Sequence, residues 1–417
     1  MQSVYFILVL FIGLISCKSS EMQPETQENQ LKSPENIAAS AISVTYTAES
    51  DFINGMAGFG FLSVDQLSLN RSATANGYNS VYGFNIPANY QQEGFKWNSG
   101  DQATEDWRPQ GISGFTQNGR RYLVVTWYGI GPSNIAGVYN QHKGVRISLI
   151  DITNMNDIKY RLLLLVQDKD NMSNSDLYKS SNPYEQLEEF APVTIHAGGV
   201  ACYNNLMYVA DTKLGIRVFD LNKFVEVESD PSKNRIGKES DGTLKAFNYR
   251  YVLPQVGYYK ITNGSPFSCI SLGNVPGSTQ KMLWTGQYIK SSSTKTPQIF
   301  GFRLNSQGQI QTQVVAEVIT PKDKYDPVVY NMQGVYRMGD ITWMAITGKS
   351  SYQGSTARML RYHDGTEAGV RYRWPHGAED LYYEESTGYL WNLTEYESSK
   401  YGQENRAVFA VKLEDYL

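Results

Sequence analysis

Residues 196–221 of this 417-residue chain, HAGGVACYNNLMYVADTKLGIRVFDL, contain three short strands in succession. The alternation of residue types predicts them at residues 199–203, 206–211 and 216–220. Asn204-Asn205 lies between the first two, and Lys213-Leu214-Gly215 between the last two; both suit tight hairpin turns. Three antiparallel strands cannot bury their own faces, so this β-meander predicts that copies of it stack elsewhere in the chain.

Copies of the same pattern occupy most of the sequence. They are predicted at residues 109–167, 199–256, 267–319, 334–373 and 378–412, with a charged loop at residues 226–245 inside the second. The first four copies have four strands each, and the fifth has three before the chain ends. Sequential antiparallel meanders of this kind are typical of β-propellers.

We therefore predict an all-β fold, a β-propeller of four-stranded blades with five blades favoured. A strand from residues 40–100 then supplies the fourth strand of the last blade and closes the ring, which removes an open sheet edge. The alternative has six blades, with residues 45–100 as a degenerate extra blade. A two-domain β-sandwich fits less well, because the meanders follow one another along the chain.

The N-terminal residues predict export and attachment to a membrane. Residues 4–15 are an apolar run that ends in Leu14-Ile15-Ser16-Cys17, which resembles a bacterial lipoprotein signal without its usual preceding Lys or Arg. We expect residues 1–16 to be the signal peptide, Cys17 the lipidated residue, residues 17–39 a disordered tether and residues 40–417 one domain. The protein would then be anchored outside the cytoplasm, in the periplasm or at the cell surface. An ordinary secretory signal is the alternative.

Composition limits the class of partner. The net charge is −4 and the basic residues are scattered, which argues against nucleic acid as a partner. Aromatic residues make up 13% of the chain, with 30 Tyr, and there are 36 Gly, a mixture typical of all-β secreted domains. Aromatic rings also suit sugars, whose C–H faces pack on them. Cys202 and Cys269 are either two small buried side chains or a disulfide, and we expect a monomer.

Several motifs together resemble a known group of proteins. The motifs are WRPQGIS at residues 107–113, the HAGGVA, YVADT and IRVFDL segments within residues 196–221, GAEDLYY at 377–383 and LWNLTEY at 390–396. The set, which covers residues 105–415, resembles a group of uncharacterised bacterial secreted and lipoprotein β-propellers. That resemblance implies a propeller outside the cytoplasm and implies no particular activity.

The repeat also predicts which side chains share one side of the molecule. A hairpin reverses the chain, so the start of each first strand lies beside the end of each second strand. We take as candidate catalytic residues His196, Asp211, Glu379 and Glu395, and as candidate ligand-binding residues Gln110, Trp127, Tyr128, Gln287, Gln333, Lys349 and Asp380.

Each candidate also has a structural interpretation. His196 can bind backbone groups, Gln110 and Gln333 can cap unpaired strand ends, and Asp211 can cap a tight turn. Glu379 and Asp380 are successive residues whose side chains point in opposite directions along a strand. One of them would then face the centre while the other anchors the blade.

Three kinds of chemistry fit the candidates. Glu379, Glu395 and Asp211 supply the carboxylates that glycoside cleavage requires, as in a hydrolase or lyase. Carboxylates with Gln carbonyls suit Ca²⁺, whereas His196 favours a transition metal. Amides and aromatics without a reaction would bind a glycan or another small polar ligand. We expect a carbohydrate ligand at the axis, leave open whether it is cleaved, and keep a non-catalytic protein-interaction or glycan-binding scaffold as the alternative.

Overall fold

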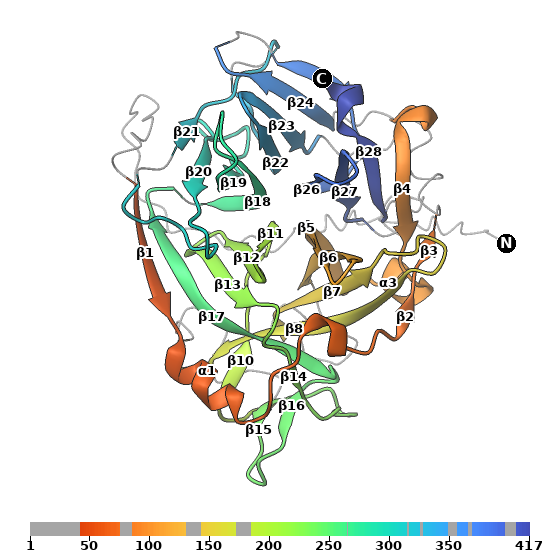
Figure 1. Cartoon of the computed structure of the whole chain (residues 1–417), viewed down its shortest axis with the longest axis vertical. Coiled ribbons are helices and arrows are strands. Elements are labelled where there is room, and N and C mark those ends of the chain that lie inside the picture. Colours follow the sequence, from red (N-terminus) through yellow and green to blue (C-terminus); the bar gives the residue numbers. More distant parts are fainter. Residues whose placement is uncertain are drawn as a thin grey trace, which may run out of the picture. The chain divides into compact units, whose positions relative to one another are not determined.

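The computed structural model describes residues 42–75, 86–130, 143–171, 185–264, 266–314, 317–325, 328–348, 357–365, 369–396 and 406–417 (Figure 1). Strands dominate these ranges, and the predicted all-β fold is confirmed. None of the helices in the described ranges combines the length and apolar character needed to cross a bilayer. Cys17 and the predicted signal and tether lie outside the described residues.

Five repeats of antiparallel strands follow one another along the described chain. The first contains β5 (Trp107–Gln117), β6 (Arg120–Gly129), β7 (Val145–Asp151) and β8 (Lys159–Asp168); the second contains β11 (Val200–Tyr203), β12 (Leu206–Asp211), β13 (Gly215–Asp220) and β17 (Tyr251–Thr262). The third contains β18 (Phe267–Asn274), β19 (Lys281–Gln287), β20 (Ile299–Arg303) and β21 (Glu317–Ile319). The fourth contains β22 (Met332–Met338), β23 (Ile341–Ile346), β24 (Arg358–His363) and β25 (Val370–Arg373), and the fifth β26 (Ala378–Glu384), β27 (Tyr389–Thr394) and β28 (Val408–Lys412).

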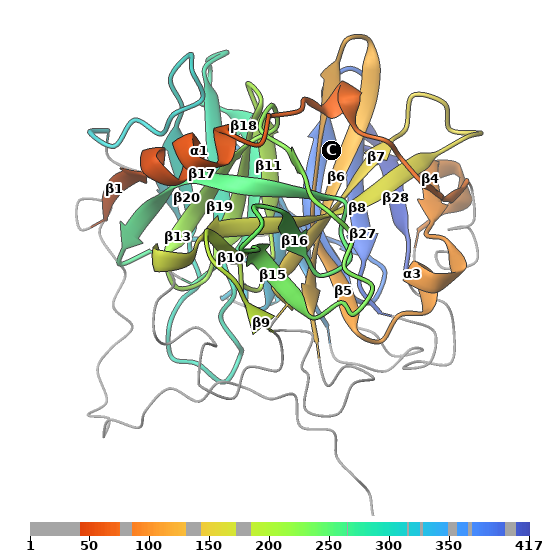
Figure 2. The ribbon, with the colours of Figure 1, turned by 90° about the horizontal axis from the view of Figure 1, so that it is seen from below.

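The N-terminal region joins these repeats at several places. β1 (Ser43–Ala48) pairs with β17, and α1 (Ser50–Ala57) packs beside the same strand (Figure 2). β2 (Arg71–Ser72) pairs with β8. β4 (Gln91–Lys96) pairs antiparallel with β28, β3 (Thr74–Ala75) pairs with β4, and α3 (Ser99–Ala103) leads into β5.

The segment at residues 226–245, predicted as a charged loop, contains strands. β14 (Val225–Glu226) pairs with β17, and β15 (Arg235–Lys238) pairs with both β16 (Leu244–Ala246) and β9 (Glu185–Gln186), while β10 (Phe190–Pro192) pairs with β8. Ile236 and Leu244 are buried among apolar side chains. The loop prediction was wrong because these few apolar residues are spaced among charged ones and form strands only by packing on the repeats.

The first strands of the repeats, β5, β11, β18, β22 and β26, lie around a common centre (Figure 1). At glycine positions the backbones of neighbouring first strands approach each other closely. A Cβ added at Gly199 would lie 2.2 Å from the Ile270 nitrogen, and one at Gly111 would lie 2.7 Å from the Val200 nitrogen. Glycine is needed at both positions because no larger residue permits this approach.

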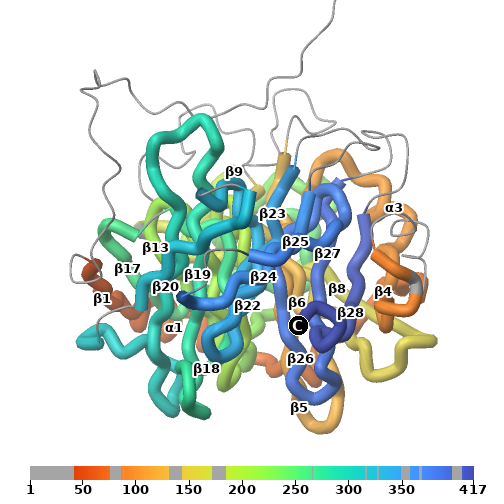
Figure 3. Tube along the Cα trace, turned by 90° about the horizontal axis from the view of Figure 1, so that it is seen from above, coloured from red at the N-terminus to blue at the C-terminus, as the bar shows by residue number. Residues whose placement is uncertain are grey.

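The hairpins that join first and second strands extend to one side of the molecule. Figure 3 shows this for the β5–β6, β18–β19 and β26–β27 hairpins. The starts of the first strands and the ends of the second strands therefore share the opposite side, as the repeat predicts. Cys202 and Cys269 lie on the first strands β11 and β18, and both are buried, free thiols.

Candidate functional site

Register shifts near the starts of the first strands direct polar side chains to the centre. The pairing of each first strand with its second strand shifts between Pro109 and Ile112 in β5, between Met332 and Gly334 in β22, and between Ala378 and Leu381 in β26. Such bulges put extra residues opposite the partner strand and change where their side chains point. The residues at these shifts include Gln110, Gln333, Glu379 and Asp380.

Two amide–carboxylate pairs form there between different repeats. Gln110 Nε2 donates a hydrogen bond to Glu395 Oε2 at 3.0 Å, from the first repeat to the fifth. Gln333 Nε2 donates to Glu379 Oε1 at 3.2 Å, from the fourth repeat to the fifth. Gln110, Glu379 and Glu395 are buried. The amides therefore hold the carboxyl groups of Glu379 and Glu395 in place between repeats.

Glu379 has a pKa well above its ordinary value. Burial is the main cause, followed by the negative charges of Glu395 and Asp380, while Arg108 and the Gln333 hydrogen bond act in the opposite direction. Glu379 Oε2 is buried and has no hydrogen-bond partner among the described residues. Its surroundings therefore favour the protonated form of this carboxyl group.

An imidazole stacks on a phenol beside these carboxyl groups. The rings of Tyr128 and His196 are 4.2 Å apart at their centroids. His196 is solvent-exposed, so this pair presents one aromatic face to solvent.

Sequence reasoning assigned no role to Arg108 and His376 in this group. The Arg108 guanidinium hydrogen-bonds the Tyr128 hydroxyl and lies over the Tyr396 ring at 5.5 Å. His376 stacks on Tyr396 with 5.2 Å between ring centroids. Arg108 could have been found, because it precedes Gln110 by two residues and so lies on the same face of the strand. We call the group Arg108, Gln110, Tyr128, His196, Gln333, His376, Glu379, Glu395 and Tyr396 the axial cluster.

Asp380 binds the first strands of other repeats. Its Oδ2 accepts hydrogen bonds from the Val200 backbone nitrogen at 3.0 Å and from the Ile112 backbone nitrogen at 3.4 Å. Ile270 contributes a further backbone hydrogen bond. The carboxyl group has no exposed surface, and burial raises its pKa well above the ordinary value. Asp380 thus ties the fifth repeat to the first three below the axial cluster.

The other predicted site residues in the described ranges contact groups outside the axial cluster. Asp211 Oδ2 accepts from Arg217 Nε at 2.8 Å, and its Oδ1 accepts from two backbone nitrogens in the following turn. Trp127 is fully buried and donates to Ser148 Oγ. Gln287 caps its own repeat through Gly264 and Gln298. These three contacts are structural rather than part of the axial cluster, and Lys349 lies outside the described residues.

Possible metal ligands and cavities among the described residues can be compared with the axial cluster. Among the described residues, no group of three or more His, Cys, Asp or Glu side chains is arranged to hold a metal ion. Two cavities, of about 180 Å³ near Tyr122 and about 550 Å³ near Phe59, are lined by residues outside the axial cluster. The axial cluster is therefore defined by its side-chain contacts.

Comparisons with known proteins give distant structural similarities. No protein-family model matches the sequence, and no curated protein matches it. A GH43_1 enzyme from Xanthomonas citri aligns with 9% identity and a TM-score of 0.40 over 74% of this chain and 88% of that one. PhoX of Pseudomonas fluorescens, in complex with vanadate, aligns with 10% identity and a TM-score of 0.38 over 86% and 98%. A gluconolactonase from Xanthomonas campestris aligns with 12% identity and a TM-score of 0.31 over 84% and 97%. At these TM-scores the similarities establish no activity for this chain.

Proposed function

We propose that the five repeats are the blades of a five-bladed propeller, with β4 as the fourth strand of the last blade. The antiparallel pairing of β4 with β28 supports this arrangement. The short strands β1 and β2 at the N-terminus add to the second and first repeats instead of forming a blade of their own, which favours five blades over six. We also propose the lipid anchor at Cys17, on the sequence of residues 1–17.

The proposed function is binding of a small carbohydrate at the axial cluster, outside the cytoplasm. The observation that supports it is the convergence of two amide–carboxylate pairs with the stacked pairs Tyr128–His196 and His376–Tyr396. Sugar hydroxyls both donate and accept hydrogen bonds, which carboxyl and amide groups satisfy. Sugar C–H faces pack on aromatic rings, so the cluster offers both kinds of contact.

Binding can be tested by calorimetric titration of the purified protein with a panel of neutral oligosaccharides of two to four residues. His196→Ala removes one ring of the exposed pair and should weaken the affinity about tenfold, or about 1.4 kcal/mol. The matched control is His363→Ala, whose imidazole is exposed and pairs with Asp340 outside the cluster. Equal affinities for His196→Ala and the wild type, or no binding of any oligosaccharide, would contradict the proposal.

Cleavage of the bound sugar is the second candidate, favoured by the raised pKa of Glu379 beside the second carboxyl group, Glu395. A protonated carboxyl next to another carboxyl group is the pair that glycoside cleavage uses. Glu379→Gln should lower the release of reducing ends about 100-fold or more while binding is kept, since general acid catalysis contributes at least that much.

The control for cleavage lies at the end of the strand that carries Glu379. Glu385, directly after β26, is exposed and pairs with Lys281, so Glu385→Gln should keep the wild-type rate. Cleavage by the wild type should also fall as pH rises through the raised pKa of Glu379, because the acid form is lost. Oligosaccharide binding without any cleavage by the wild type would leave the non-catalytic binding function.

A further inference from the structure

A fully buried arginine lies next to the axial cluster. Arg406, just before β28, has no exposed surface. Five backbone carbonyl groups accept hydrogen bonds from its guanidinium. Their distances are 3.0 Å for Glu395, 2.9 Å for Asp101, 3.4 Å for Gln102, 2.9 Å for Thr104 and 3.1 Å for Trp107. A buried charge of this kind is stable because the carbonyl dipoles replace its hydration.

These carbonyls come from two distant parts of the sequence. Glu395 follows β27 near the C-terminus, whereas residues 101–107 run from α3 to the start of β5. The guanidinium is planar and rigid, so hydrogen bonds from Nε and Nη2 fix the directions of the Glu395 and Trp107 carbonyls relative to each other. Glu395 belongs to the axial cluster, and Trp107 directly precedes Arg108, which also belongs to it.

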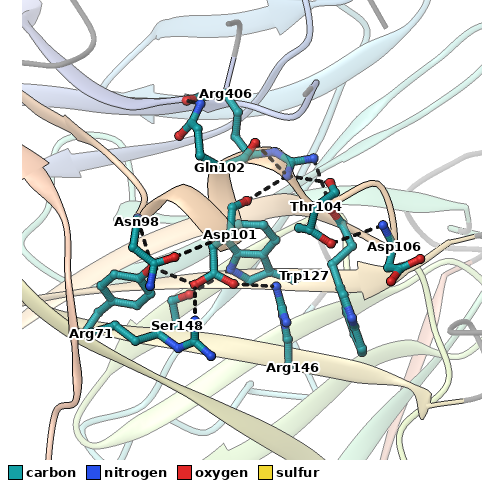
Figure 4. A network of polar contacts seen from close by, with 12 residues as sticks. Arg71, Asn98, Asp101, Gln102, Thr104, Asp106, Trp127, Arg146, Ser148 and Arg406 are labelled. Atoms are coloured by element: carbon teal, nitrogen blue, oxygen red, sulfur yellow. Dashed lines mark hydrogen bonds and ion pairs between the residues drawn. The ribbon is translucent and has the colours of Figure 1, made fainter. Parts of the chain in front are cut away.

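The surrounding contacts strengthen this link. Gln102 Nε2 donates back to the Arg406 carbonyl at 2.6 Å, and Figure 4 shows both residues above Asp101. Asp101 in turn accepts from Arg71, Arg146 and Tyr160. The segment that carries Arg108 is therefore held between Arg406 on one side and the first repeat on the other.

We infer that Arg406 is a positioning residue of the axial cluster, which sets Glu395 and Arg108 in place when the two ends of the repeat array meet. The cluster is then assembled by the same contact that joins the first and fifth repeats. The inference rests on the axial cluster being the proposed binding site. A lysine at this position keeps the charge but cannot direct hydrogen bonds to both carbonyls, since its single ammonium group lacks the fork geometry.

The test uses the four histidines of the chain as reporters in the absence of any ligand. In proton–carbon correlation spectra of the whole protein, Arg406→Lys should shift the ring signals of His196 and His376. The His196 ring stacks on Tyr128, which binds Arg108. The His376 ring stacks on Tyr396, which follows Glu395. The signal of His363, whose imidazole pairs with Asp340 outside the cluster, should keep its wild-type position.

The matched control is Arg217→Lys. Arg217 is a buried arginine that binds Asp211, Gln167 and Gln255 in another part of the fold. Both variants should lower the melting temperature, but Arg217→Lys should leave the signals of His196 and His376 unchanged. A folded Arg406→Lys protein with all four wild-type signals, or equal shifts in both variants, would overturn the inference.

A milder variant covers the case in which Arg406→Lys does not fold. Gln102→Met removes the amide that donates to the Arg406 carbonyl and keeps the guanidinium. It should shift the same two signals by a smaller amount, and unchanged signals would refute the positioning role. Because no sugar is present, failure to bind oligosaccharides would contradict the proposed function alone.

Discussion

Glu379 and Asp380 are successive carboxyl residues with different surroundings. Glu379 pairs with Gln333 in the axial cluster, and Asp380 accepts backbone hydrogen bonds from Val200 and Ile112. The register shift between Ala378 and Leu381 lets both side chains contact neighbouring repeats. Two neighbouring carboxyl residues therefore differ in role, since Glu379 belongs to the axial cluster and Asp380 holds strands of different repeats together.

Asp380 should stabilise the fold mainly because its side-chain oxygen accepts backbone hydrogen bonds, and less because of its charge. Asp380→Ala leaves the Val200 and Ile112 N–H groups without their acceptor and should lower the free energy of unfolding by about 3 kcal/mol. Asp380→Asn keeps an acceptor oxygen and should lower it by about 1 kcal/mol. Urea unfolding of both variants measures these losses, and equal losses would contradict this role.

The pH dependence of Asp380→Asn follows from the raised pKa of Asp380. Between its unfolded pKa of about 3.9 and its higher folded pKa, the native state binds more protons, so stability falls as pH rises. Asparagine removes this dependence. The stability difference between wild type and Asp380→Asn should therefore be largest in acid and shrink toward alkaline pH. A stability difference that stays constant from pH 4 to pH 8 would contradict the raised pKa of Asp380 in the folded protein.

At the scale of elements, the packing of the first strands depends on glycine at the centre. A Cβ at Gly199 would lie 2.2 Å from the Ile270 nitrogen and 2.5 Å from the Cys269 carbonyl carbon. Gly199→Ala should therefore push β18 away and lower the free energy of unfolding by about 3 kcal/mol, as overpacking against rigid backbone does. Thermal or urea unfolding measures the change.

The control for this prediction is Gly55→Ala in α1. A Cβ there would lie 3.6 Å from the nearest atom, Glu189 Oε2, which is an ordinary contact. Alanine also favours helix over glycine by about 1 kcal/mol. Gly55→Ala should thus be neutral or stabilising, and a loss comparable to that of Gly199→Ala would show that packing at the centre is not the cause.

At the scale of the whole molecule, a buried polar network holds the segment before β5 to the first repeat. Asp101 accepts from Arg71 at 3.0 Å, Tyr160 at 2.6 Å and Arg146 at 3.4 Å, and Arg146 lies over the rings of Trp107 and Trp127 (Figure 4). Side chains of the first and fifth repeats also share one buried apolar cluster. The Asp101 network therefore holds α3 to the first repeat, and the apolar cluster joins the two ends of the repeat array.

Asp101→Ala should lower the free energy of unfolding by about 3–5 kcal/mol, because it leaves a buried Arg146 without its carboxylate. Asp157→Ala is the matched control, since that exposed carboxylate pairs with Lys159 at the surface and should contribute less than about 1 kcal/mol. Urea unfolding compares the two variants. Similar losses would mean that the Asp101 network contributes little to stability.

Local patterns in the sequence predict the strands of the five repeats and their order, although not the short strands at residues 225–246. Alternating residues and hairpin turns predict the repeat directly, because strand period and turn chemistry are local properties. The same repeat predicts that Gln110, Tyr128, His196, Gln333, Glu379 and Glu395 share one side, and they form three contacting pairs, Gln110–Glu395, Gln333–Glu379 and Tyr128–His196. The position of a residue at a strand end is visible in the sequence, which is why this group could be assembled without coordinates.

Contacts in the tertiary structure determine which side chains at those strand ends face the centre. Trp127 and Asp211 lie at the predicted strand ends, yet one packs in the core and the other binds Arg217. Strand position predicts the end of the sheet at which a residue lies, whereas register shifts and neighbouring repeats decide where its side chain points. Arg406 and Glu395 lie beside Trp107 only because distant parts of the chain meet, and contacts across some 290 positions leave no local pattern in the sequence.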